Sequence, residues 1–173
     1  MLKLHLIRKI LSRKGQSVVE ISLIAPLLLV ALYIPADFGI AMFTAHLTQN
    51  AVREAARIGV STKDPFNSPA GNAIANEALS RIPAGLKPVT VTVSYYNGPA
   101  VTPPCMQSVE VKAQGNYNYF IYQLMRMFGA TVPNSVAITR TSRMRYEFQP
   151  VTNGPPSTPI CSSAPPPSTV TRP

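Results

Sequence analysis

Glu20 is the first residue whose chemistry needs an explanation, because it lies near the start of a long apolar run. The stretch "RKGQSVVEISLIAPLLLVALYIP" covers residues 13–35, and Glu20 is its only acidic residue. A carboxylate inside a segment that crosses a membrane is costly, so it is a functional hypothesis by default. We therefore expect Glu20 to have a positively charged partner.

The sequence indicates no catalytic centre. His5 lies close to the N-terminus, and His46 lies more than two helical turns from Asp37. No nucleophile, base and orienting group occur together. Cys105 and Cys161 form no C-x-x-C motif and have no His cluster beside them, which argues against a metal site. We expect a protein that is not an enzyme and that uses no cofactor and no metal.

The positive charge is concentrated in the N-terminal residues. The chain has a formal net charge of +9, and its first basic residues are Lys3, Arg8, Lys9, Arg13 and Lys14, with no acidic residue among them. The other basic residues are scattered and form no dense patch with interleaved aromatic residues. A nucleic-acid partner is therefore not expected.

The run that follows is long enough to cross a membrane. Ile21–Phe43 exceeds the roughly 20 mostly apolar residues that a spanning helix needs. Pro26, Pro35 and Asp37 interrupt it, and prolines are tolerated where neighbouring helices satisfy the backbone. We expect Asp37 to cap a break after Pro35 or to face a partner helix. The basic flank predicts a cytoplasmic N-terminus with the rest of the chain outside.

A cleaved secretory signal is the main alternative to a membrane anchor. Leu23–Ala36 has the length of a signal's apolar region, and "IPA" at residues 34–36 is acceptable as a peptidase site. Two observations argue against it. Glu20 would lie at the start of that apolar region, and a helical pattern continues beyond Ala36 as far as Val60.

This helical pattern has a face of small residues and a polar face. The small residues recur at spacings of three and four, and they are Ala41, Ala45, Thr48, Val52, Ala56 and Gly59. The opposite face carries His46, Gln49, Asn50, Arg53, Glu54 and Arg57. Glu54 and Arg57 are spaced for an i,i+3 ion pair. The small face predicts either a helix lying on its own domain or close packing between subunits.

A continuous helix from Gln16 to Val60 would be roughly 68 Å long at 1.5 Å per residue. This length is about twice the hydrocarbon thickness of a bilayer. Half of the helix would therefore span the membrane, and half would project beyond it as a stalk.

These features together resemble a pilin family. A basic leader, Gly15, a glutamate at Glu20 and then an apolar helix with Pro26 resemble the class III signal of type IV pilins and pseudopilins. More specifically, "GQSVVEISLIAPLLL" followed by "LTQNAVREAARIGV" resembles the TadE family, the minor pseudopilins of tight-adherence (Tad/Flp) pilus systems. The family's closing motif corresponds here to Ala55, Ala56 and Arg57.

The resemblance implies a processing site and a role for Glu20. Prepilin peptidase would cut between Gly15 and Gln16 on the cytoplasmic side, which would leave a free amine on Gln16. Glu20 lies one helical turn later on nearly the same face, and in an assembling bundle it would pair with the amine of a neighbouring subunit. Before assembly, Glu20 would instead extend to the headgroup region without a partner.

The resemblance also implies partners and a location. The partners would be prepilin peptidase, other pilins and pseudopilins of the same system, the inner-membrane assembly platform and the lipid bilayer. The protein would cross the bacterial inner membrane once, with a cytoplasmic N-terminus and a periplasmic C-terminal domain, or would lie outside the cell in the pilus.

The remaining sequence predicts a small α+β domain of pilin-like type. We divide the chain into a leader (1–15), a transmembrane and stalk helix (16–60), an exported domain (61–149) and a Pro-rich tail (150–173). Within the exported domain, periodicity predicts helices near 70–82 and 118–129 and strands near 87–98, 107–115 and 134–148. The resulting three or four antiparallel strands would pack against the stalk helix.

The tail is expected to lie outside the packed core as an extended or disordered segment, because it is Pro-rich and has almost no charge. Cys105 and Cys161 would both lie in an oxidising compartment, where pairing is favoured. A bridge between them would attach the tail to the loop after the first strand. The alternative is two thiols facing solvent.

Two functions are consistent with the sequence. One is a minor pseudopilin that helps to initiate or extend a pilus, as a tip or shaft component. The other is a single-pass envelope binding or adhesion protein with an exported ligand-binding domain. Only the first requires cleavage after Gly15.

Overall fold

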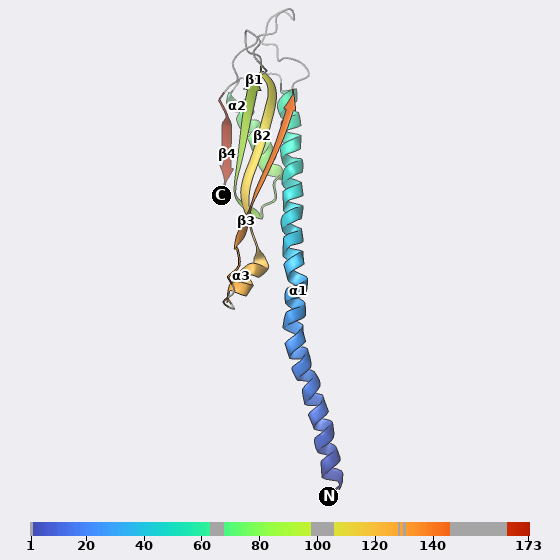
Figure 1. The fold of residues 1–173 in the computed structure, drawn as a ribbon. Coiled ribbons are helices and arrows are strands. Elements are labelled where there is room, and N and C mark those ends of the chain that lie inside the picture. Colours follow the sequence, from blue (N-terminus) through green and yellow to red (C-terminus); the bar gives the residue numbers. More distant parts are fainter. Residues whose placement is uncertain (1, 63–67, 98–105, 128, 130, 146–165) are drawn as a thin grey trace, which may run out of the picture.

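A computed structural model describes residues 2–62, 68–97, 106–127, 129, 131–145 and 166–173 of the chain (Figure 1). Its elements in chain order are α1 (Leu2–Ser61), α2 (Ser68–Arg81), β1 (Leu86–Asn97), β2 (Met106–Asn118), α3 (Phe120–Met127), β3 (Ser135–Arg145) and β4 (Ser168–Arg172). The predicted α+β class is confirmed. The strands form an antiparallel sheet beside one end of a much longer helix.

Helix α1 is continuous over 60 residues, which corresponds to roughly 90 Å at 1.5 Å per residue. Pro26 and Pro35 both lie inside it. A proline removes one backbone donor and bends a helix, but each of these prolines leaves the helix unbroken. The expectation that Asp37 caps a break after Pro35 is therefore wrong, since there is no break to cap.

The sheet has the strand order β3-β2-β1-β4 and is antiparallel throughout. Val91 pairs with Ala113, and Val93 pairs with Val111, so the apolar side chains of β1 and β2 lie on one face. These valines are fully buried, whereas Thr90 and Thr92 on the other face contact Thr171 and Thr169 of β4 through their hydroxyls. One face is therefore covered by helices, and the other is polar.

Strand β4 shows that the end of the tail belongs to the sheet. It pairs with β1 from Val89↔Arg172 to Val93↔Ser168. The guanidinium of Arg172 donates to the backbone oxygens of Leu79, Ile82 and Pro83, at 3.0, 3.2 and 3.1 Å. These carbonyls lie at the C-terminal end of α2, so Arg172 supplies donors that the helix end lacks.

The expectation that the whole tail lies outside the packed domain is accordingly wrong for its last residues. Alternating Thr and Val side chains suit an edge strand, although the proline content before them favours an extended segment without sheet pairing. Cys105 and Cys161 lie outside the described residues, so their bridge stays a prediction.

The second half of α1 packs on the sheet through its small residues. Ala41, Ala45, Thr48, Val52 and Ala56 are at most 5% exposed and join the core formed by α2 and the strands. At Gly59 a Cβ atom would lie only 3.2 Å from Val109 Cγ1, which shows how closely this helix approaches β2. Of the two interpretations of the small face, the helix lying on its own domain is confirmed.

We predict that Gly115→Ala destabilises the domain. A Cβ atom at this position in β2 would lie 2.6 Å from Leu86 Cγ and 2.9 Å from the backbone oxygen of Pro88. Because a backbone atom is one of the two neighbours, relief needs a strand shift, and overpacking of this kind costs roughly 1–3 kcal/mol. Chemical denaturation followed by tyrosine fluorescence would measure the loss in the free energy of unfolding.

Gly85→Ala is the matched control. Its Cβ would have Tyr117 Cε2 as nearest neighbour at 4.0 Å, which is an ordinary contact. It should therefore change the free energy of unfolding by no more than about 0.5 kcal/mol. Equal denaturation midpoints for the two variants would contradict the close approach at Gly115.

Candidate functional site: the N-terminal helix and its junction with the domain

The first half of α1 presents an exposed apolar surface. Most large apolar side chains from Val18 to Phe43 are exposed, and Leu23 and Leu27 are each 71% exposed. Within Gln16–Ser61, an 18-residue window has a mean hydropathy of 2.3, and none of it is buried in the protein. By length and composition this helix is able to cross a membrane, which is compatible with single-pass anchoring.

The predicted processing site and Glu20 lie at the start of this surface. The backbone of Gly15 is part of α1, which runs on without interruption into Gln16. Gln16 Nε2 donates to Glu20 Oε1 at 3.2 Å, and both side chains are exposed. Residues 16 and 20 therefore lie on one face of α1, as their spacing predicts, and the Glu20 carboxylate reaches the side chain of residue 16.

Pro26 leaves the backbone carbonyl of Ser22, within the apolar half of α1, without its usual helical donor. It is exposed and lies within the helix, and it has no N–H to donate to the carbonyl of Ser22. The Ser22 hydroxyl donates to the carbonyl of Val19 at 2.8 Å. The Ser22 carbonyl thus lacks the donor that residue 26 would otherwise supply, and a neighbouring helix can supply one in its place.

The motif at residues 55–57 combines packing with a surface ion pair. Ala55 and Ala56 are 0% exposed and lie in the core of the domain. Arg57 donates to both carboxylate oxygens of Glu54, at 2.8 and 2.6 Å. These distances confirm the predicted i,i+3 pair, and the hydrogen bond lowers the pKa of the Glu54 carboxyl.

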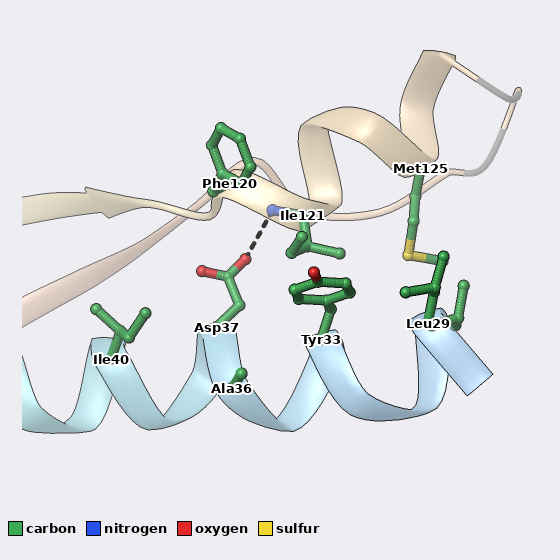
Figure 2. A pocket seen from close by; sticks show the side chains of 9 residues that line it. Leu29, Tyr33, Ala36, Asp37, Ile40, Phe120, Ile121 and Met125 are labelled. Atoms are coloured by element: carbon green, nitrogen blue, oxygen red, sulfur yellow. Dashed lines mark hydrogen bonds between the residues drawn. The ribbon is translucent and has the colours of Figure 1, made fainter. Parts of the chain in front are cut away.

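Asp37 joins α1 to α3. Its carboxylate is buried, with the residue 4% exposed, and Oδ1 accepts a hydrogen bond from the Tyr117 hydroxyl at 3.3 Å. Oδ2 accepts from the backbone N–H of Ile121 at 3.0 Å (Figure 2). Ile121 is the second residue of α3, so Asp37 caps the start of that helix from another element.

Helix α3 needs this external cap. Its first turn contains no acidic residue, and the residue before it is Tyr119, which has no short polar side chain to accept from the free N–H groups. The expectation that Asp37 faces a partner helix is therefore corrected, because its partners come from its own domain. The absence of a capping residue before α3 is the sequence signal that could have indicated this.

An aromatic cluster surrounds the junction. Tyr117 and Tyr119 pack edge to face with ring centroids 5.7 Å apart, and Tyr119 and Tyr122 lie 4.6 Å apart. Burial, and then the negative charge of Asp37, raise the pKa of the Tyr117 phenol. A phenol is already protonated at neutral pH, and these effects act in the same direction, which favours the hydrogen bond that the hydroxyl donates to Asp37.

Comparison with protein families assigns the N-terminal part of the chain. Residues 15–57 match the model of the family described as TadE-like protein. The segment is TadE-like. The match runs from Gly15 to Arg57 and so includes Glu20, Pro26 and Asp37. Searches of the curated proteins and of the solved structures gave no match.

The TadE-like match associates the chain with Tad pilus systems, whose TadE-like members are structural components that interact with other pilus components. Within the described chain, the partners of Asp37 lie outside the matched segment, since Tyr117 and Ile121 both follow Arg57. Asp37 thus adds a hydrogen-bonded attachment of the TadE-like helix to the rest of this protein, besides the small residues that pack on the sheet.

We predict that Asp37→Ala loosens α3. The substitution removes the acceptor of the Ile121 N–H, and the loss of an N-cap costs roughly 0.5–2 kcal/mol. Amide hydrogen exchange in peptides from α3 should therefore accelerate by about 2- to 30-fold in detergent-solubilised protein.

Two controls separate the cap from general damage. Asp37→Asn keeps one acceptor oxygen and should retain part of the protection, and Tyr117→Phe should leave the Ile121 bond in place. Exchange in α2 should be the same in all variants. An unchanged exchange rate of α3 in Asp37→Ala would contradict the capping role.

Proposed function

We propose that this protein is a minor pseudopilin that takes part in the assembly of a Tad/Flp-type pilus, as an initiation, tip or shaft component. The observation that carries the proposal is the division of α1 into two halves. Its first half is apolar and exposed, and its second half is packed on the domain. The family match begins at the predicted cleavage site at the start of the exposed half.

In this proposal the leader, residues 1–15, is removed by prepilin peptidase between Gly15 and Gln16. Residues 16–60 anchor the mature protein and project from the membrane, and residues 61–149 form the exported domain. Residues 150–173 form the tail, in which Ser168–Arg172 pairs with β1 as β4. The N-terminus faces the cytoplasm, and the domain lies in the periplasm or, after assembly, in the pilus.

Cleavage gives Glu20 a chemical role. The mature Gln16 carries a charged amine, and an amine and a carboxylate in a region of low dielectric each lose several kcal/mol of solvation unless they are paired. Within one chain, the exposed Glu20 carboxylate accepts a hydrogen bond from the Gln16 side chain, so it is able to accept from a donor at the level of residue 16. Between subunits this pair would fix the axial register of neighbouring helices, while the exposed apolar residues supply the contact area.

We predict that the membrane-extracted protein begins with "QSVVEIS", because cleavage falls after Gly15. Edman or mass-spectrometric sequencing of the mature N-terminus measures this directly. Gly15→Ala, or a larger residue at this position, should leave the precursor uncut. Gly39→Ala is a matched control, since a Cβ there meets nothing within 4 Å and the processing site is unchanged.

A different mature N-terminus decides between the functions. A start at Asp37 would establish the secretory-signal alternative, and an intact leader in a strain with active peptidase would favour the envelope binding protein. Either result would overturn the pseudopilin proposal.

We predict that Glu20→Ala preserves membrane insertion but impairs piliation. The variant removes a costly charge from an apolar segment, and it leaves the amine of the neighbouring subunit unpaired. Pili would be counted by electron microscopy in a strain that lacks the wild-type copy, and membrane fractions would be compared by immunoblot.

Glu77→Ala is the control for removal of a carboxylate elsewhere. Glu77 pairs with Arg81 on the exposed side of α2, far from the apolar half of α1 along the chain, so its loss should leave piliation unchanged. Normal piliation in Glu20→Ala would show that the pairing is wrong.

A further inference from the structure

Helix α3 lies alongside the apolar half of α1. A groove of about 500 Å³ separates the two helices, and its lining includes Leu29, Tyr33 and Ile40 of α1 and Phe120, Ile121 and Met125 of α3. Figure 2 shows Phe120 above the stretch near Asp37 and Met125 reaching toward Leu29. Helix α3 therefore runs back along α1, toward the N-terminal end of that helix.

This position places α3 at membrane depth, an inference that rests on the proposed orientation of α1. If the span begins near Gln16, about 20 residues carry it to the neighbourhood of Pro35. Leu29 then lies roughly 9 Å inside the outer boundary at 1.5 Å per residue. The end of α3 beside Leu29 would thus be in the outer leaflet, and its capped start beside Asp37 would be at the surface.

The side of α3 that lines the groove suits this depth. Phe120 is 76% exposed, and the lining of the groove is apolar apart from Asp37 and Tyr33. Tyr33 is 45% exposed and lies near Pro35, where the span would reach the membrane surface. Aromatic residues are enriched at membrane surfaces. The exposed residues Leu29 and Val30 continue the groove into the apolar surface of α1. The groove is therefore part of the surface that the anchor would present to lipid.

Arg126 distinguishes a lipid from a protein as the occupant. It is exposed and donates to Asn134, and among the described residues no acidic side chain forms an ion pair with it. A second copy would present the uncharged residues 21–36 of α1 at this level. A phospholipid instead supplies a phosphate for the guanidinium and an acyl chain for the groove, because a long Arg side chain can extend to the headgroup region.

We propose that α3 is a second membrane contact, which lies in the outer leaflet beside α1 while phospholipid acyl chains fill the groove between the two helices. Asp37 holds α3 at this depth through its bond to Ile121. Two contacts with one bilayer fix the rotation of the exported domain about α1, which a single helix does not fix.

The chain contains no Trp, so single Trp residues can report depth. Phe120→Trp and Met125→Trp would be placed in vesicles of phosphatidylcholine and phosphatidylglycerol whose acyl chains carry bromine, a quencher of Trp fluorescence. Tyr33→Trp reports on the membrane span. Tyr96 is 38% exposed near the far end of β1, so Tyr96→Trp reports on the exported domain. Emission at residues 120 and 125 should be lost to a similar extent as at residue 33, with little loss at residue 96.

Each other outcome has a distinct meaning. Quenching at residue 33 without quenching at residues 120 and 125 would overturn the second contact and leave the proposed anchor intact. No quenching at residue 33 would overturn the membrane-spanning orientation itself. A third outcome is blue-shifted emission at residue 120 that is quenched only after the protein is diluted into excess lipid. This result would show that a neighbouring copy fills the groove, and it would also overturn the proposal.

Discussion

One uninterrupted helix has to satisfy two different environments, and the rest of the structure depends on this constraint. Its second half is buried in the domain and uses Ala45, Val52 and Ala56, whose small side chains let the helix lie close to the sheet. Its first half carries exposed side chains such as Leu23 and Leu27 that find no cover within the protein. In water this apolar surface would be strongly unfavourable, and its exposure is compatible with a cover of lipid or of other subunits.

Asp37 lies where the two halves meet. A buried carboxylate is stable only when its hydrogen bonds are made, and Tyr117 and Ile121 provide them from the exported part of the chain. The same bonds fix the start of α3, which brings an apolar groove alongside the exposed half of α1. The junction therefore links the geometry of the anchor to that of the domain. In a pilus subunit this link would pass the orientation of the assembled helices on to the domain.

Patterns within one segment were predicted well from the sequence. The alternation of Val89, Val91 and Val93 gave a half-buried strand, and the spacing of Glu54 and Arg57 gave their ion pair. The packing of the small face of α1 on its own domain was predicted, but the specific contacts of Asp37 and of β4 with distant segments were not. The prolines beside Asp37 do not indicate its partners, which lie about 80 residues later in the chain. The Pro-rich sequence before β4 likewise says nothing about edge pairing with β1. Periodicity reports which face is apolar, but it does not report what covers that face.

The most direct test of the account is the accessibility of α1 to oxygen and to a water-soluble nickel chelate, measured by spin-label power saturation in bilayers. Nitroxides would be placed on single cysteines at exposed positions, namely Leu27 and Leu32 in the first half and His46, Asn50 and Arg53 in the second. Cys105 and Cys161 would be replaced by serine. The account predicts high oxygen and low nickel accessibility at Leu27 and Leu32, and the reverse at His46, Asn50 and Arg53. Equal ratios in the two halves would contradict the division of α1 between membrane and domain.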